Sequence, residues 1–240
     1  MLKIYILHVE ELKRKARQEW ILAGLNLQRR EKVCKCLLEK VRLLSLGAGA
    51  LLWYGVSCYL EEQSHGAGFV QDSDCAPFMV SWEMLERQLK KPYVESHMLE
   101  TKEGPHGKPY LQHLPVFFNL SHSGDLAVCA VSDREVGVDV QKIESGNHEN
   151  LWKRYFTKAE QEMLLSCAGE EEKEQLFYRF WVQKEAYGKL TGAGLASSLK
   201  ESPGLWPKQL GISMTEFPVL PGYCGAVCRY LIYNDTYRSV

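Results

Sequence analysis

Hydrophobic residues recur along the chain with two different periods, which predict strands and helices in a mixed order. Short runs that are apolar throughout, or at every second position, are typical of strands, and we place strands at 3–9, 116–123, 126–132, 135–141, 212–217 and 223–233. Apolar residues at helical spacing predict helices at 10–22, 29–59, 82–90, 157–167 and 177–195. The second of these helices is expected to bend near Gly47 and Gly49, and the polar segments 63–77, 142–150 and 196–208 are expected to be loops. The chain is therefore predicted to be an α+β protein.

Two short motifs occur twice in the chain. A helix leading to Gly-Ala-Gly is found at 47–49 and at 192–194, and an Ala-Val-Cys strand at 127–129 and at 226–228. The two pairs have unequal offsets, which excludes a regular repeat. The motifs fit two related α+β halves that meet near residue 133, and they also fit chance.

Charge is distributed unevenly along the sequence. The 240 residues have a net charge of −1, which gives no general reason to expect nucleic-acid binding. Positions 13–42, however, carry ten Lys and Arg residues against three Glu residues. This basic tract is either a solvated helical face or a surface for a polyanionic small molecule or an acidic partner.

Cysteine spacing and apolar run length indicate the compartment. The eight cysteines include no C-x-x-C pair and no Cys/His set with zinc-finger spacing, so we expect reduced thiols and a cytoplasmic protein. Residues 1–15 lack the apolar core and the small-residue cleavage site of a signal peptide. No run is expected to reach the roughly 18 apolar residues of a membrane span, so no membrane partner is predicted.

Candidate chemistry is concentrated in one helix and one strand. In the last long predicted helix, Trp181, Glu185 and Lys189 follow one another at steps of four residues and share one face. In a predicted strand, Asp139 and Gln141 point to the same side of the sheet. Their oxygen atoms, with those of Glu185, suit Mg²⁺, which typically takes one or two protein carboxylates together with substrate phosphates. Taken singly, the same residues are better explained by a solvent-facing strand position and a surface Glu–Lys pair.

Five short motifs follow one another between about residues 105 and 195: GKP at 107–109, FNLSHS at 118–123, GVDVQ at 137–141, RYFTKAE at 154–160 and WVQKEAYGKLTGAGL at 181–195. In this order they resemble the 4′-phosphopantetheinyl transferase superfamily, in its larger, surfactin-type branch. Over residues 1–60 the match is looser and consists of a strand, a helix and the basic stretch 29–32.

The resemblance implies a fold and a reaction. The fold would consist of two similar α+β halves, 1–133 and 134–240, related by pseudo-two-fold symmetry, with the ligand in the cleft between them. Coenzyme A would bind with its pyrophosphate on Mg²⁺, with Mn²⁺ as the alternative ion, and a serine of an apo acyl or peptidyl carrier protein would attack the β-phosphate. 4′-Phosphopantetheine would be transferred and adenosine 3′,5′-bisphosphate released. The protein is expected to be a monomer.

The resemblance also implies roles for individual residues. Asp139, Glu185 and Lys189 would be catalytic, and Asp139, Glu185 and Gln141 would bind the metal. Glu160 is either an acid of the site or the capping-box acid of the helix that begins near it. Coenzyme A would be bound, mainly by the first half, through Arg29, Lys32, Lys108, Ser121, His122, Lys184 and Lys189.

The carrier protein would dock over the second half and the 142–150 loop, and Trp181 would pack beneath the site. Gln141 departs from the family pattern, which usually has a third carboxylate at this position. A Gln carbonyl can coordinate Mg²⁺ without adding charge, and two carboxylates already balance the ion. We therefore expect retained activity with weaker metal binding. Two alternative functions are a coenzyme A-binding protein without transferase activity and an unrelated Mg²⁺-dependent phosphohydrolase.

Overall fold

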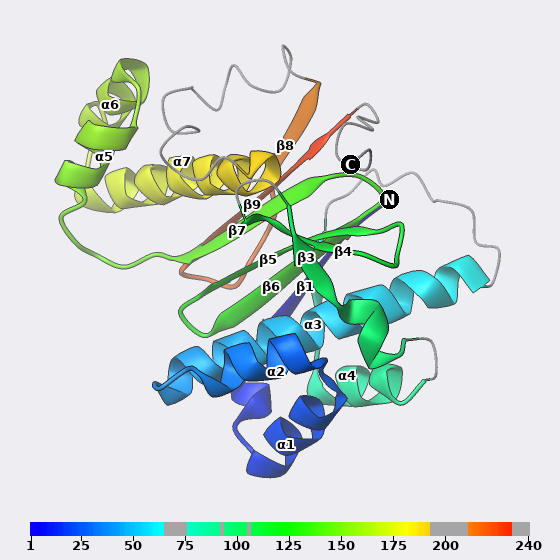
Figure 1. The fold of residues 1–240 in the computed structure, drawn as a ribbon. Coiled ribbons are helices and arrows are strands. Elements are labelled where there is room, and N and C mark those ends of the chain that lie inside the picture. Colours follow the sequence, from blue (N-terminus) through cyan, green and yellow to red (C-terminus); the bar gives the residue numbers. More distant parts are fainter. Residues whose placement is uncertain (65–75, 92–93, 105–106, 193–210, 232–240) are drawn as a thin grey trace. The chain divides into compact units, whose positions relative to one another are not determined.

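In a computed structural model, the protein combines helices with several β-sheets, which confirms the α+β class (Figure 1). The structure describes residues 1–64, 76–91, 94–104, 107–192 and 211–231. The chain falls into two compact units, Met1–Asp133 and Arg134–Val240, and each unit has its own sheet and core. Gly194, Leu195, the predicted loop at 196–208 and most of the one at 63–77 lie outside the described residues.

The first unit is built on a four-stranded sheet in the order β2-β1-β6-β5. Its strands are β1 (Leu2–His8), β2 (Phe78–Met79), β5 (Phe117–Ser123) and β6 (Leu126–Ser132). The central strand β6 is antiparallel to both β1 and β5, whereas β2 is parallel to β1. The long helix α3 (Glu39–Ser64) packs on this sheet, and every residue of β6 is buried.

Helix α3 is continuous, so the prediction of a bend near Gly47 and Gly49 is wrong. Gly47 serves instead for close packing on the sheet, since a Cβ added there would lie 3.3 Å from the Cβ of Ala127. The predicted helical tract breaks earlier, at residues 35–38, where α2 (Leu27–Cys34) ends before α3 begins. Periodicity alone missed this break because the connecting residues are themselves apolar.

Helix α3 also corrects the expectation that no run is long and apolar enough to cross a membrane. It contains an 18-residue window whose mean hydropathy reaches 1.5, enough by length and composition for a span. However, 83% of that window is buried inside the protein. Its apolar character is therefore explained by its place in the core of the first unit.

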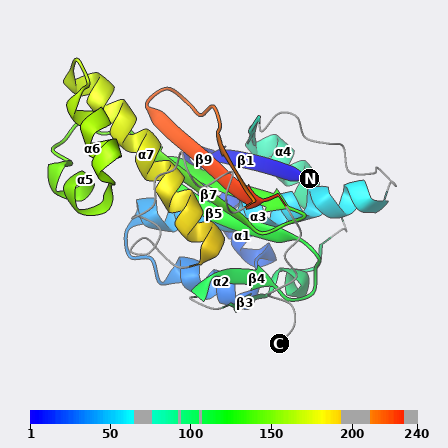
Figure 2. The ribbon, with the colours of Figure 1, turned by 90° about the horizontal axis from the view of Figure 1, so that it is seen from above.

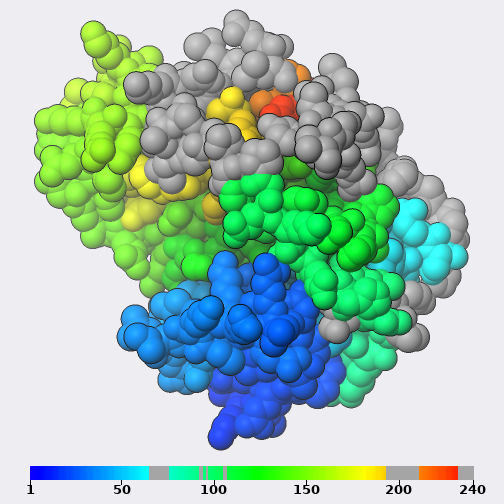
Figure 3. Space-filling model, in the orientation of Figure 1, coloured from blue at the N-terminus to red at the C-terminus, as the bar shows by residue number. Residues whose placement is uncertain are grey.

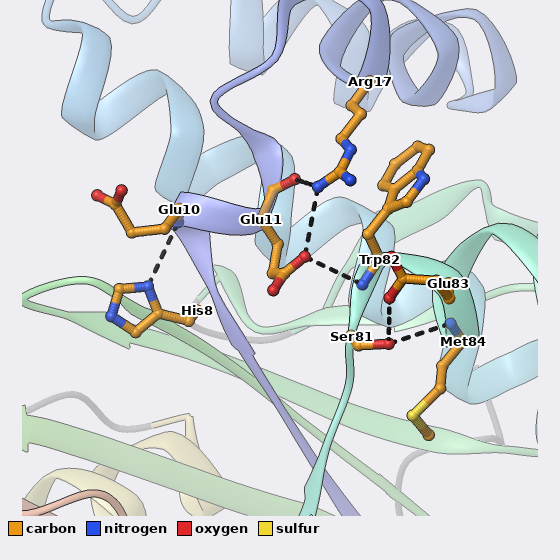
Figure 4. Close-up of polar contacts among 8 residues, drawn as sticks. All are labelled: His8, Glu10, Glu11, Arg17, Ser81, Trp82, Glu83 and Met84. Atoms are coloured by element: carbon orange, nitrogen blue, oxygen red, sulfur yellow. Dashed lines mark hydrogen bonds and ion pairs between the residues drawn. The ribbon is translucent and has the colours of Figure 1, made fainter.

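Shorter elements surround the sheet and α3. The predicted helix at 10–22 is divided into the 3₁₀ helix η1 (Val9–Leu12) and α1 (Lys15–Gly24). The Glu11 carboxylate accepts hydrogen bonds from the Trp82 backbone N–H and from the Arg17 guanidinium, each at 3.3 Å (Figure 4). It thereby fastens η1 to the first residue of α4 (Trp82–Leu89). The 3₁₀ helix η2 (Ser96–Leu99) leads into the hairpin of β3 (Thr101–Glu103) and β4 (Pro109–Leu111).

The second unit is built on an antiparallel sheet in the order β7-β9-β8. Its strands are β7 (Val136–Lys142), β8 (Ile212–Glu216) and β9 (Tyr223–Tyr230), and helix α7 (Glu170–Thr191) packs on β7 and β9 (Figure 2). Helix α7 begins well before the predicted residue 177. Its first turn contains three glutamates, whose negative charges are stabilised by the positive end of the helix dipole. Helices α5 (Glu149–Tyr155) and α6 (Lys158–Leu165) precede it, and α5 was not predicted.

The two units share one order of connections. In each, a first strand is followed by a long helix and a hairpin, and the last hairpin strand pairs with the first strand. The repeated Ala-Val-Cys motif lies in these two corresponding strands, at 127–129 in β6 and at 226–228 in β9. This agreement favours related halves over chance, while the pseudo-two-fold symmetry stays a prediction.

Candidate active site

Asp139 is a buried carboxylate in the middle of β7. Only 2% of its surface is exposed. Its Oδ1 atom accepts a hydrogen bond from Nζ of Lys189 at 2.7 Å, and its Oδ2 atom accepts one from Nε2 of Gln141 at 3.0 Å. These donors offset the lost hydration of the carboxylate, since a buried charge is tolerated only where it is paired and hydrogen-bonded.

Gly137 allows α7 to lie close to this strand. A Cβ added at Gly137 would lie 2.0 Å from the carbonyl oxygen of Ala186 and 2.5 Å from the backbone nitrogen of Leu190. Backbone atoms cannot yield to such a contact unless the whole helix moves. The missing side chain therefore sets the distance at which Glu185 and Lys189, the neighbours of those two residues, face the strand.

Glu185 is partly buried on α7, and its carboxyl group has a raised pKa. The pKa of Glu185 is raised to about 7. Burial is the largest cause and the Asp139 carboxylate adds to it, whereas the Lys189 ammonium lowers the pKa and only partly offsets these effects. Both charges act on Glu185 because they are close to it. The structure thus brings together Asp139, Glu185 and Lys189, the three residues predicted to be catalytic.

The same residues fit a divalent cation. Two carboxylates from different elements are the protein contribution that Mg²⁺ typically takes, with phosphate oxygens and water completing about six ligands. Gln141 turns its amide nitrogen towards Asp139, so its oxygen would reach an ion at this carboxylate only after rotation of the amide. Among the described residues, no three His, Cys, Asp or Glu side chains form a group that could hold a metal. An ion here would therefore depend on ligands supplied by its substrate.

Lys184, predicted to bind coenzyme A, has a different role in the structure. Its side chain is fully buried and its Nζ atom lies 3.0 Å from Oε2 of Glu160, itself 2% exposed. The same oxygen of Glu160 accepts the backbone N–H of Thr157 at 2.8 Å and completes a capping box at the start of α6. The assignment of Lys184 to coenzyme A is therefore withdrawn, because a fully buried ammonium paired with a carboxylate presents no surface to a ligand.

The remaining features of the long motif are structural. The Trp181 ring lies 5.7 Å from Phe177 and 6.2 Å from Tyr155, within an aromatic cluster that also includes Trp152. This is the packing position expected for Trp181. Gly192 ends α7 with a φ of 72°, the left-handed conformation that favours glycine at a helix end.

The first unit contains a second cluster of interest, at the contact of α2 with α3. Arg29 donates a hydrogen bond from Nη2 to the backbone oxygen of Ser45 at 2.9 Å. Among the described residues, the buried Nε atoms of Arg29 and Arg42 and the Ser45 hydroxyl have no hydrogen-bond partner. Burial lowers the pKa of Arg29, and this effect is opposed by the thiols of Cys129 and Cys36. Such atoms are explained by strain or by a water or ion that completes their hydrogen bonds.

Arg42 and Ser45 were not predicted as site residues. They lie three positions apart on α3, and Arg42 belongs to the basic tract, so the signal for them was present in the sequence. Of the other predicted coenzyme A residues, Lys32 is exposed in the last turn of α2 and Lys108 is partly buried just before β4. Ser121 and His122 are neighbours on β5, the first buried and the second exposed.

Comparison with known proteins shows what the second unit is similar to. Residues 135–213 match the model of the 4′-phosphopantetheinyl transferase superfamily, which confirms the resemblance carried by the motifs. The chain is 43% identical over 96 residues to the 4′-phosphopantetheinyl transferase HetI of Nostoc sp., an alignment that covers 38% of this chain and 40% of HetI.

Two further relatives come from Bacillus. The chain is 42% identical to psf-1 of Bacillus pumilus, over 44% of each chain. It is 35% identical to the 4′-phosphopantetheinyl transferase Sfp of Bacillus subtilis, over 51% of this chain and 59% of Sfp. The chain therefore spans about half the length of the curated relatives it matches.

Proposed function

Because residues 135–213 match the 4′-phosphopantetheinyl transferase superfamily, we propose that this protein transfers 4′-phosphopantetheine from coenzyme A to a serine of an apo acyl or peptidyl carrier protein. The observation that carries the proposal is the meeting of Asp139 and Lys189 at 2.7 Å beside Glu185, whose pKa is about 7. This arrangement lies within the matched segment and offers two carboxylates to a metal and one cation to a diphosphate.

In this proposal the serine oxygen forms a bond to the β-phosphorus of coenzyme A. The bond from that phosphorus to the bridging oxygen breaks, and adenosine 3′,5′-bisphosphate leaves with the electron pair. Mg²⁺, or Mn²⁺ in its place, would supply charge neutralisation at the diphosphate when bound between Asp139 and Glu185.

The side chains of the second unit have distinct tasks in this scheme. Asp139 is fixed in position by its hydrogen bond from Lys189, whose ammonium is 29% exposed and can face the diphosphate. Glu185 accepts the serine proton, directly or through water. The pKa of about 7 belongs to the ion-free site; beside a bound divalent ion the carboxylate would be ionised and able to accept a proton.

The first unit is proposed to bind the nucleotide end of coenzyme A. Coenzyme A carries a diphosphate and a phosphomonoester, and the phosphomonoester alone has a charge of about −1.5 to −2 near neutral pH. Arg29 and Arg42 are only partly buried as residues, and their guanidinium charges would suit phosphate oxygens. The exposed Lys32 and His122, with Lys108 and Ser121, remain the predicted contacts to the rest of the nucleotide.

The test is mass spectrometry of an apo carrier incubated with coenzyme A, Mg²⁺ and the protein. The proposal expects a mass gain of one phosphopantetheine group and the release of adenosine 3′,5′-bisphosphate. Tight binding of coenzyme A without modification of the carrier would favour a binding protein, and cleavage of coenzyme A without any carrier would favour a phosphohydrolase. A panel of fatty-acid, polyketide and peptide-synthetase carriers would identify the pathway.

We propose that the carrier protein docks on the second unit. The protein itself would act as a monomer in the cytoplasm. The 146–149 part of the predicted docking loop includes Glu149 and lies beside Glu170 and Glu174, with the basic Lys173 also there. An acidic carrier would therefore be attracted less by the loop than by the neighbouring Lys153, Arg154 and Lys158 of α5 and α6. Charge reversal at Lys158 should raise the Michaelis constant for carrier and leave that for coenzyme A unchanged; equal effects on both constants would contradict docking there.

A further inference from the structure

The connection between α2 and α3 exposes apolar side chains that the core does not use. We call residues 35–41 the α2–α3 tip. Leu37 is 99% exposed and Leu38 is 69% exposed, and Val41, one turn into α3, is 43% exposed. Single exposed leucines are common on protein surfaces, but three large apolar side chains within one short turn form a patch.

The shape of the tip limits what can cover it. A side chain that is 99% exposed has almost no neighbours, so Leu37 projects from a convex turn rather than lining a groove. Protein-binding sites for apolar anchors are typically concave or flat, whereas a projecting side chain inserts readily into a soft medium such as a lipid bilayer. The tip belongs to the first unit, where α2 and the start of α3 are the blue surface segments in Figure 3.

Charge at the tip points to the same kind of partner. Lys35 and Lys40 are exposed within the tip, and Lys40 also lies 3.0 Å from the Asp125 carboxylate. On α2 immediately before the tip, the exposed Arg30 and Lys32 flank the exposed Glu31, so the surface keeps a positive excess. Glu39 is the one acidic residue of the tip. Lysines beside the surface of an anionic membrane are attracted to it, and apolar side chains then add a hydrophobic contribution by entering the boundary between headgroups and acyl chains.

We propose that the α2–α3 tip binds the surface of anionic lipid membranes, with Leu37 and Leu38 inserted and Lys35 and Lys40 on the headgroups. This binding is peripheral. It differs from the sequence-based expectation of no membrane partner, which concerned segments that cross a bilayer. It can be tested apart from the transferase reaction, because residues 35–41 of the tip are not among the proposed coenzyme A contacts, although the neighbouring Lys32 is.

The experiment is flotation of the full chain with vesicles of phosphatidylglycerol and phosphatidylcholine, compared with vesicles of phosphatidylcholine alone. The protein should float with the anionic vesicles at low salt and much less at 0.5 M salt (about 4 Å of screening length). The double variant Leu37→Ser/Leu38→Ser should bind at least about ten-fold more weakly. Leu165→Ser is the matched control, because Leu165 is 66% exposed on α6 in the other unit, and it should bind like the unchanged protein.

A charge-reversal variant tests the electrostatic contribution of Lys35 separately from the insertion of the leucines. Lys35→Glu should weaken vesicle binding at low salt, and Lys158→Glu on α6 should not. All these positions are exposed, so circular dichroism and the melting temperature should be unchanged.

Three results would overturn the proposal: no flotation of the unchanged protein with anionic vesicles, equal flotation of the Leu37→Ser/Leu38→Ser variant, or equal loss in the Leu165→Ser control. Absence of flotation together with a raised Michaelis constant for carrier in the tip variant would show that the tip docks a protein instead. Carrier modification is measured without vesicles and tests the transferase reaction separately. Either proposal can therefore fail while the other is still tested.

Discussion

Replacing Glu185 with Gln should stabilise the protein at alkaline pH and not at acidic pH. The folded state raises the pKa of Glu185 from its usual 4.5 to about 7, so the folded protein holds this proton more tightly than the unfolded chain does. Below pH 4.5 the carboxyl is protonated in both states and has no effect on stability. As pH rises from there through 7, the unfolded chain gives up the proton more easily, and the folding free energy becomes less favourable until both states are ionised.

The size of the effect follows from the shift. A shift of this size corresponds to about 3 kcal/mol at most, since one pKa unit is about 1.4 kcal/mol. Glu185 is only partly buried and solvent screens its charge, so we expect about 1–2 kcal/mol. For a chain of this length that is a rise in melting temperature of about 2–8 °C at pH 8.5 for Glu185→Gln, against a small change at pH 5.

Calorimetry or thermal unfolding at the two pH values, with and without Mg²⁺, measures both effects. Mg²⁺ at pH 8.5 should raise the melting temperature of the unchanged protein, because in our proposal the ion would bind the folded state through Asp139 and Glu185. It should leave Glu185→Gln nearly unaffected, and transfer to the carrier should be abolished in that variant. Glu171→Gln, on the exposed first turn of the same helix, is the control and should show neither effect. A pH-independent difference would refute burial as the cause of the raised pKa, and equal stabilisation of both proteins by Mg²⁺ would refute the metal site.

Three further substitutions test the architecture around the site. Gly137→Ala should lower kcat/KM about 100-fold, because α7 must move by an ångström or more. Gly169→Ala, where an added Cβ meets nothing within 4 Å, is the control and should not. Similar kinetics for both variants would contradict a need for close approach of α7 to β7. Lys184→Met should lower the free energy of unfolding, measured with urea, by about 3–5 kcal/mol, because the Glu160 carboxylate loses its ion-pair partner. The affinity for coenzyme A should not change. A weaker affinity in the folded variant would restore Lys184 as a coenzyme A ligand. Gln141→Glu should keep activity and lower the Mg²⁺ concentration required, so a titration showing complete loss would contradict its place beside the metal.

Sequence patterns were most informative where one physical effect dominates. The strands at 126–132 and 135–141 were predicted nearly to the residue because short apolar runs bounded by turn residues are typical of buried strands. Helix α5 was missed because its short polar sequence has little periodicity, and it is held by the insertion of Trp152 into an aromatic cluster formed with α7. The break between α2 and α3 was missed because exposed leucines imitate a core pattern.

Some site residues could be predicted from motifs and periodicity, whereas others depend on burial that only the structure shows. Asp139, Glu185 and Lys189 could be proposed from the motifs, and their mutual contact follows from the period of a strand and of a helix. Lys184 was misassigned because a motif gives spacing and not burial, and its partner Glu160 lies in a different helix. Arg42 and Ser45 were overlooked because only the packing of α2 on α3 shows that their polar atoms are buried without partners.

In our proposal, the charge balance of the metal site accounts for Gln141, at a position where the resemblance to the transferase superfamily leads us to expect a carboxylate. Asp139 and Glu185, when ionised, cancel the charge of one divalent ion, and the Lys189 ammonium then leaves the site with one net positive charge. A third carboxylate would remove that excess and would leave the site neutral towards an anionic diphosphate. It would also lie beside the buried Asp139, where a second negative charge would raise the pKa of Glu185 further and make the ion-free state less stable. Gln141 avoids both effects and still donates a hydrogen bond to Asp139 at 3.0 Å. We therefore expect Gln141 to favour stability of the ion-free protein and attraction of substrate over metal affinity, with the proposed site retained.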